Sequence, residues 1–212
     1  MKTVTVIDYG MGNLHSVAKA LEHVATTEKI IVSGDPQTIL KADRVVLPGV
    51  GAMRDCMGEI KRLGLHDVIH EVANNKPLFG VCVGMQAMLQ SSEENEGVEC
   101  LGLFKGRVLE FEKNIPELAN NPNLKIPHMG WNQVNQCTEH PMWQGVAQNS
   151  RFYFVHSYYV EPASSDVIVG TSNYPVMFTS AIANDNIFAV QFHPEKSQHS
   201  GLQLYKNFLN WL

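Results

Sequence analysis

A cysteine boxed by glycines, Gly80-Val81-Cys82-Val83-Gly84, constrains the fold of this chain more than any other stretch of its sequence. A short apolar run from Pro77 leads into it, and a helix-like segment, Met85 to Leu89, follows directly. This order predicts a nucleophile elbow, a tight strand-to-helix turn that pushes its central side chain up and out. The glycines let neighbouring backbone come close, and the helix N-terminus behind Cys82 favours its thiolate form.

Strand-like and helix-like segments alternate before the elbow. Apolar strand patterns cover residues 3–8, 29–32 and 44–47. One helical pattern follows the turn at residues 10–12, and a second covers residues 65–74. Such alternation implies a parallel sheet with helices on both faces. We therefore predict an α/β fold built on a three-layer, mostly parallel open sheet.

The second half of the chain has a different texture. Extended segments are expected at residues 102–111, 151–160, 167–171, 176–183 and 187–192, with turn residues at 120–123 and 184–186. These segments predict antiparallel hairpins added to the main sheet, followed by a last helix over residues 197–212. Because no repeat or low-complexity linker divides the chain, we expect a single domain over residues 1–212.

Composition argues against several functional classes. The net charge is −5 with no basic run, which argues against a nucleic-acid surface. No stretch approaches the length of a membrane span, and the N-terminus has a strand pattern rather than a signal-peptide pattern. The four cysteines form no Cys-x-x-Cys pair, so neither a zinc site nor a disulfide framework is indicated. We expect a cytoplasmic protein with no cofactor and no metal.

A cysteine nucleophile needs a base and a group that orients the base. Among the nine histidines, His193 stands at the end of an apolar strand, where open α/β sheets place their sites. Glu195, two residues on, is placed to accept a hydrogen bond from the imidazole. A lone cysteine is usually an inert small hydrophobe, and a lone His-Pro-Glu is usually a surface corner. Their joint occurrence favours a triad of Cys82, His193 and Glu195.

Acyl transfer also requires donors for an oxyanion. One candidate is the backbone N–H of Val83, directly after the nucleophile. The other is the glycine-rich turn Pro48-Gly49-Val50-Gly51 after the third strand. A plain strand-ending turn is an equally good interpretation of that second segment.

These three motifs together resemble the class I (triad) glutamine amidotransferases, and the resemblance covers essentially the whole chain. Within that family, several stretches are most similar to the branch of glutaminase subunits that serve imidazole glycerol phosphate synthase. They are Ile7 to Leu14, Pro127-His128-Met129-Gly130-Trp131-Asn132, Phe154 to Tyr159 and Pro194 to Ser197. The departures, Val83 and Met53, are apolar replacements of apolar residues.

The resemblance implies hydrolysis of L-glutamine at Cys82 and delivery of ammonia to a separate (β/α)8-barrel cyclase subunit, the partner in a heterodimer. There the ammonia is used to make imidazole glycerol phosphate and an aminoimidazole carboxamide ribonucleotide in histidine biosynthesis. The residues assigned by resemblance fall into three groups. They are the oxyanion residues Val50, Gly51 and Val83; the glutamine-binding residues Gly49, Gln86, His156, Ser157 and Tyr158; and the partner-facing residues Trp131, Asn132 and Lys196.

Three alternatives stay open on the sequence. The chain is compatible with a stand-alone thiol γ-glutamyl hydrolase, with an amidotransferase subunit serving a different synthase, and with a non-catalytic interaction module on the same fold. Other features have simpler interpretations. His66 and His70 have a metal-ligand spacing, yet no third ligand is evident. The acidic stretch at residues 93–96 is expected to be a solvated loop, and the three other cysteines small packing groups.

Overall fold

The computed structural model describes residues 2–116 and 125–212. Five parallel strands form the centre of the molecule, in the spatial order β2-β1-β3-β4-β14. They are β1 (Thr3–Ile7), β2 (Lys29–Ser33), β3 (Arg44–Gly49), β4 (Leu78–Cys82) and β14 (Ile187–Val190). The register pairs Gly49 with Cys82 and Val190 with Val81, so these three strands end at one edge of the sheet. The predicted parallel open sheet is confirmed.

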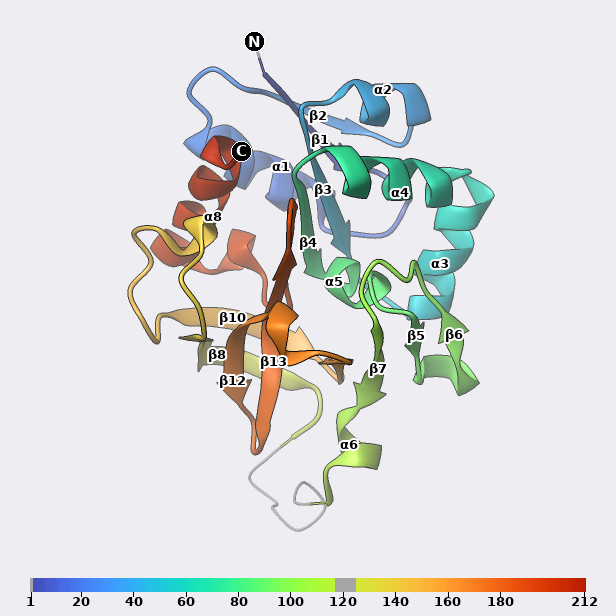
Figure 1. The fold of residues 1–212 in the computed structure, drawn as a ribbon, viewed down its shortest axis with the longest axis vertical. Helices are drawn as coiled ribbons and strands as arrows, with labels where there is room; N and C mark the ends of the chain where they lie inside the picture. Colours follow the sequence, from blue (N-terminus) through green and yellow to red (C-terminus); the bar gives the residue numbers. More distant parts are fainter. Residues whose placement is uncertain (1, 117–124) are drawn as a thin grey trace.

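Helices cover both faces of this sheet. α1 (Leu14–Val24) packs with α8 (Gln198–Asn210) on one side, while α2 (Pro36–Lys41), α3 (Met53–Arg62) and α4 (Leu65–Asn75) lie on the other (Figure 1). The sequence prediction omitted α2 and α3. α2 is only six residues long, with Asp35 accepting a hydrogen bond from the N–H of Thr38 at its start. α3 does show helical spacing, because its buried residues are Met53, Cys56, Met57 and Ile60.

The sheet continues with further strands, mostly antiparallel, beyond β14. The order is β14-β13-β11-β7-β5-β6, and β12 and β9 extend from β13. These strands are β5 (Ser91–Ser92), β6 (Val98–Glu99), β7 (Gly106–Glu110), β9 (Asn135–Gln136), β11 (Tyr158–Pro162), β12 (Ile168–Asn173) and β13 (Met177–Asn184). Because β14 of the second half pairs with β4 of the first, a single domain over residues 1–212 stays our proposal.

The extended segment predicted at residues 151–160 is two strands in two sheets. β10 (Arg151–His156) pairs with β8 (His128–Gln133) in a separate two-stranded sheet, whereas β11 joins the main sheet. The chain passes from one sheet to the other at Ser157, without a glycine or proline to mark the change. The expectation that hairpins are simply added to the main sheet was wrong for this pair.

Short helices complete the description: α5 (Val83–Ala87), α6 (Phe111–Asn114), and the 3-10 helices η1 (Glu94–Glu96), η2 (Pro141–Trp143), η3 (Ser165–Val167) and η4 (Pro194–Lys196). The last helix begins at Gln198 and ends at Asn210, inside the predicted range. The turn predicted at residues 120–123 lies outside the described residues.

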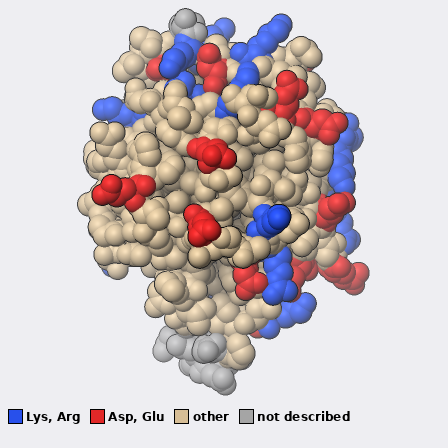
Figure 2. Space-filling view, viewed as in Figure 1, with Lys and Arg blue, Asp and Glu red and all other residues tan. Residues whose placement is uncertain are grey.

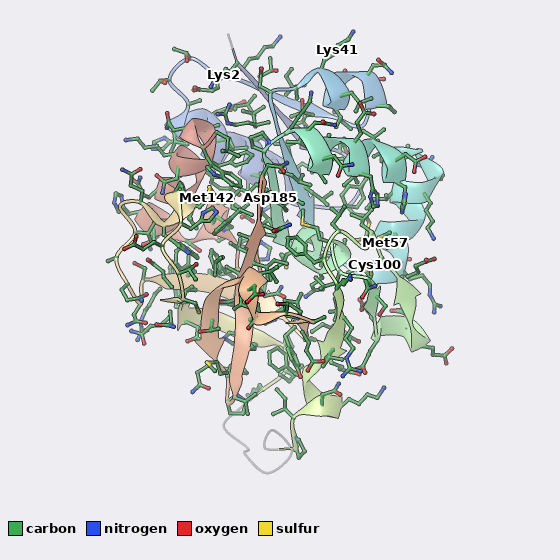
Figure 3. The ribbon with its side chains drawn as sticks, viewed as in Figure 1. Lys2, Lys41, Met57, Cys100, Met142 and Asp185 are labelled. Atoms are coloured by element: carbon green, nitrogen blue, oxygen red, sulfur yellow. The ribbon has the colours of Figure 1, made fainter. Side chains whose placement is uncertain are left out.

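The core is largely apolar, and most charged side chains stay outside it. Met57, Cys100 and Met142 are buried, whereas Lys2 and Lys41 extend from the upper rim of the molecule (Figure 3). Charged side chains of both signs are scattered over the face in Figure 2. Arg44 is a buried exception, and its guanidinium donates to the carbonyls of Phe208, Trp211 and Leu212. No helix in residues 2–116 and 125–212 is long and apolar enough to cross a membrane.

Candidate active site

Cys82 lies in a strained turn between β4 and α5. Its φ of 55° and ψ of −113° are unusual for a residue with a side chain. A Cβ on Gly84 would come within 2.0 Å of the Leu47 carbonyl oxygen, and one on Gly80 would come within 2.9 Å of the Ala189 Cβ. The glycines on both sides of the cysteine are therefore required by neighbouring atoms, as the elbow pattern predicts.

The elbow does not leave its cysteine exposed. Cys82 is only 4% exposed, and its side chain lines a cavity. The expectation of a side chain pushed up and out was therefore wrong as to exposure. The side chain is reached through the cavity, where the strands β10 and β11 bring the segment around His156 opposite the elbow.

His193 and Glu195 form a buried pair beyond the end of β14. The Nδ1 of His193 lies 2.8 Å from Oε1 of Glu195, and both side chains are almost fully buried. The backbone N–H of His193 donates to the Tyr153 carbonyl, and Ser197 Oγ donates to the carbonyl of His193. These bonds fix the imidazole between β10 and η4, with Nδ1 directed to the carboxylate.

The other imidazole nitrogen is the one left to interact with Cys82, the predicted nucleophile. His193 Nε2 is buried, and within the described residues it makes no hydrogen bond of ordinary geometry. Burial alone would lower the pKa of this imidazole, but the charge and hydrogen bonding of Cys82 and of Glu195 raise the pKa to about 10. The sulfur and the carboxylate beside it therefore favour the protonated form of this imidazole.

A cavity of about 350 Å³ opens onto the sulfur. Its described lining brings together most residues predicted for catalysis and glutamine binding. They are Val50, Gly51, Cys82, Val83, Gln86, Glu94, Pro127, Val155, His156, Ser157, Tyr158 and His193. Gly49, also predicted to bind substrate, is buried and is not among the described lining residues. A Cβ there would lie 2.7 Å from the Tyr9 hydroxyl and 2.8 Å from the Gly84 nitrogen, so packing requires a glycine, and its role in substrate binding stays a prediction.

Two glutamine side chains connect the cavity wall to the sulfur. Gln86 Nε2 donates to the Tyr158 carbonyl over 3.1 Å and to Gln191 Oε1 over 2.9 Å. Gln191 Nε2 in turn donates to Cys82 Sγ over 3.8 Å. The sequence analysis missed Gln191. A polar residue between apolar neighbours at the end of a buried strand is a signal that could have found it.

Glu94 was also missed. Its carboxylate accepts a hydrogen bond from the Met53 backbone N–H over 2.8 Å and lines the cavity. The interpretation of residues 93–96 as only a solvated loop was wrong at this position. Among the described lining residues, Glu94 is the one carboxylate.

Two side chains donate hydrogen bonds to carbonyls of the turn that includes Val50. The Tyr9 hydroxyl donates to the Pro48 carbonyl over 2.7 Å, and Cys56 Sγ donates to the Val50 carbonyl over 3.6 Å. Burial raises the pKa of the Cys56 thiol to about 11. Cys56 and Cys100 are buried, as the expectation of packing groups requires, but Cys137 is exposed, so that expectation was wrong for Cys137.

The residues predicted to face a partner lie on β8 and η4. Trp131 is 42% exposed, so it is not a core aromatic. Its ring lies 6.2 Å from that of Tyr153, over which the Lys196 ammonium sits at 5.7 Å. Asn132 is half-buried, and its side chain contacts the Asn173 carbonyl and His128 instead. A role of these three residues at a partner surface stays a prediction.

The fold and this cysteine-lined cavity are those of an amidotransferase domain, and the chain belongs to the glutamine amidotransferase class-I family, whose model matches residues 5–211. Solved structures agree on the fold. PurLQS from Thermotoga maritima has a TM-score of 0.73 at 18% identity and covers 99% of this chain and 98% of its own. Another solved structure, of a glutamine amidotransferase, has a TM-score of 0.72 at 14% identity, covering 98% of this chain and 97% of its own.

Curated relatives assign the chain to one branch of this family. The chain is 57% identical to imidazole glycerol phosphate synthase subunit HisH 1 of Pseudomonas aeruginosa, covering 100% of this chain and 98% of the relative. It is 56% identical to subunit HisH of Acinetobacter baylyi, covering 100% and 99%. The chain is thus an enzyme of the HisH branch, the glutaminase subunits of this synthase.

Proposed function

We propose that this chain hydrolyses L-glutamine through Cys82, His193 and Glu195 and passes the ammonia to a cyclase subunit of imidazole glycerol phosphate synthase. The observation that carries the proposal is the buried His193–Glu195 pair, whose second imidazole nitrogen faces Cys82 in a cavity of about 350 Å³. The near-identity in length with the HisH relatives supports the same assignment.

The proposed reaction uses first the Cys82 thiolate and then the His193 imidazolium. The Cys82 thiolate forms a bond to the side-chain amide carbon of glutamine, and the carbonyl oxygen becomes an oxyanion beside the backbone of Val83 and the turn at Val50 and Gly51. The C–N bond then breaks, and His193 gives the Nε2 proton to the leaving nitrogen. Water attacks the thioester carbon and transfers a proton to His193, the C–S bond breaks, and glutamate leaves.

The cavity offers complementary groups for the rest of the substrate. The Glu94 carboxylate is suited to the α-ammonium group of glutamine. Gln86, His156, Ser157 and Tyr158 also line the cavity, and Gln86 donates a hydrogen bond to the Tyr158 carbonyl. A neutral amide side chain would then extend toward the sulfur.

Ammonia requires a protected route, because in water near neutral pH it is mostly ammonium, which is not a nucleophile. A partner seated over the site would exclude water. We propose that this partner is a (β/α)8-barrel cyclase in a heterodimer with synthase (lyase) activity, contacted through Trp131, Asn132 and Lys196. A cytoplasmic location stays a prediction that fits such a biosynthetic step.

The decisive experiment replaces the sulfur. In Cys82→Ala the nucleophile is gone, so we expect glutaminase turnover to fall at least ~1,000-fold. Turnover of the synthase complex with added ammonium salts should be retained. Because Cys82 is buried, the change should still cost about 1 kcal/mol of unfolding free energy.

Cys137→Ala is the matched control, since Cys137 is exposed and outside the cavity. It should keep full glutaminase activity. A fall in the glutaminase turnover of Cys82→Ala much smaller than ~1,000-fold, or loss of its ammonia-dependent reaction, would contradict the proposal. Hydrolysis of γ-glutamyl peptides without any partner would favour the stand-alone hydrolase instead.

A further inference from the structure

A chain of hydrogen bonds runs from strand β8 to the glutamine cavity through two buried histidines. His128 on β8 and His156 on β10 are direct cross-strand partners in the antiparallel register. Nδ1 of His128 lies 2.8 Å from Nε2 of His156, and Nδ1 of His156 lies 2.8 Å from the Tyr158 carbonyl oxygen. At the other end, Asn132 Nδ2 lies 3.3 Å from Nε2 of His128.

The Asn132 amide at one end of the series and the Tyr158 carbonyl at the other fix the position of every proton between them. Asn132 Nδ2 is the amide nitrogen, because it also donates to the Asn173 carbonyl while Asn132 Oδ1 accepts from the Gln133 N–H. An amide nitrogen only donates, so Nε2 of His128 accepts and its Nδ1 carries the hydrogen. At the far end a carbonyl only accepts.

The direction of the middle bond follows. His128 Nδ1–H donates to Nε2 of His156, which leaves the hydrogen of His156 on Nδ1, where it donates to the Tyr158 carbonyl. Each imidazole is therefore neutral with its hydrogen on Nδ1. An added proton on either ring would set one N–H against another and break a bond of the series.

The surroundings hold both rings neutral. His128 and His156 are 3% and 6% exposed, and the His128 ring stacks on Tyr174 and Phe154 with centroids 4.0 and 4.9 Å away. Burial lowers the pKa of His128 to about 4 and that of His156 to about 3, and the charge of His193 also lowers the latter.

We infer that His128, which lies outside the predicted catalytic and binding set, is a positioning residue for glutamine that acts through His156 on the Tyr158 carbonyl. That carbonyl accepts both His156 Nδ1–H and Gln86 Nε2–H, so its position decides where two walls of the cavity lie. Asn132, on the same strand as His128, ends the series directly next to Trp131 in the chain. The inference rests on the proposed glutaminase function and deepens it.

The first test separates the hydrogen bond from the packing of the ring. His128→Phe keeps an aromatic ring against Tyr174 and Phe154 but removes the donor, whereas His128→Asn places an amide N–H where Nδ1 stood. We expect His128→Phe to raise the KM for glutamine about fivefold to tenfold, the loss of one hydrogen bond, with kcat within about twofold of wild type. His128→Asn should return KM to within about twofold of wild type.

His140→Phe is the control for a merely structural effect. His140 is a half-buried histidine that also packs on aromatic rings, Phe188 and Trp211, and it lies outside the described cavity lining. It should lower thermal stability without changing KM. An unchanged KM in His128→Phe, or equal KM values in His128→Phe and His128→Asn, would overturn the inference.

A second measurement needs no folded variant other than the wild type. Nitrogen–proton correlation spectra of the 15N-histidine-labelled chain report which imidazole nitrogen carries hydrogen. Both His128 and His156 should be neutral with hydrogen on Nδ1 at pH 7.5 and at pH 6, and a hydrogen on Nε2 of either ring would overturn the inference. If the wild-type chain with its synthase partner hydrolysed no glutamine, the proposed function would fail, while these spectra would still test the hydrogen-bond series.

Discussion

At the scale of single residues, the site depends on how one imidazole is held. Glu195 accepts from Nδ1 of His193, so the carboxylate stabilises the protonated ring and leaves Nε2–H for the leaving nitrogen. Tyr205 adds a long contact of 3.5 Å to the second carboxylate oxygen. A neutral acceptor in place of the carboxylate would orient the ring but would stabilise its charge less.

This difference predicts a change in pH dependence. The pKa of His193 is raised to about 10, so the imidazolium required for ammonia release persists through neutral pH and is lost as the pH rises through about 10. In Glu195→Gln the pKa of His193 should fall, moving the alkaline limb of kcat/KM for glutamine to lower pH, with kcat reduced about 100-fold. Wild type is the control, because the α-amino group of glutamine titrates identically in the pH profiles of wild type and of Glu195→Gln. Superimposable alkaline limbs would refute this role.

At the scale of elements, the site depends on how closely α5 packs against β3. Gly84 is in contact with the Leu47 carbonyl, and Gly49 is in contact with Gly84. The backbone approach sets the height of Cys82 above the sheet edge, where β3, β4 and β14 end together. A side chain at Gly84 could not be accommodated by a rotamer change of its neighbours, because the obstructing atoms belong to the backbone.

Two glycine-to-alanine changes test this contact. Gly84→Ala would place Cβ 2.0 Å from the Leu47 oxygen, so we expect a loss of about 3 kcal/mol or more of unfolding free energy. Gly58→Ala, inside α3 with no atom within 4 Å of the new Cβ, should instead stabilise the chain by about 0.5–1 kcal/mol. Urea unfolding midpoints of the two variants measure the contrast, and equal midpoints would show that the elbow tolerates a wider turn.

At the scale of the whole molecule, the buried neutral histidines tie stability to pH. The folded-state pKa values of His128 and His156, about 4 and about 3, lie below the ordinary value of 6.5, so the unfolded chain binds more protons at mildly acidic pH. Stability is therefore present above pH 6.5 and is lost as the pH falls. His193 does not offset this loss, because its raised pKa contributes fully below 6.5.

We expect the unfolding free energy to fall between pH 6.5 and pH 5 by about 2 kcal/mol for each of the two rings. This window lies above the ordinary range of the carboxylates, so histidines dominate it. Denaturant unfolding at half-unit pH steps measures the slope, and His128→Phe should remove about a third to a half of it, because burial also lowers the pKa of His140. A slope unchanged by that replacement would mean that His128 is not buried in the neutral form.

The sequence by itself determined the parallel α/β sheet, the elbow and the three residues proposed as a triad, because each is encoded locally. An apolar strand followed by Gly-x-Cys-x-Gly specifies a turn, and His193-Pro194-Glu195 places a carboxylate two residues from its imidazole. Helical spacing in α3 was equally local and was overlooked, and Glu94 carried no local sign that it would turn inward.

Only the tertiary structure decided which distant side chains meet. The separation of β10 from β11 at Ser157 sets His156 opposite His128, and the pairing of β14 with β4 brings Gln191 to Cys82. Such contacts join residues far apart in the chain, and their hydrogen bonds form only where two strands from different segments lie in register. Periodicity and motif spacing describe one segment at a time, so they do not contain that information.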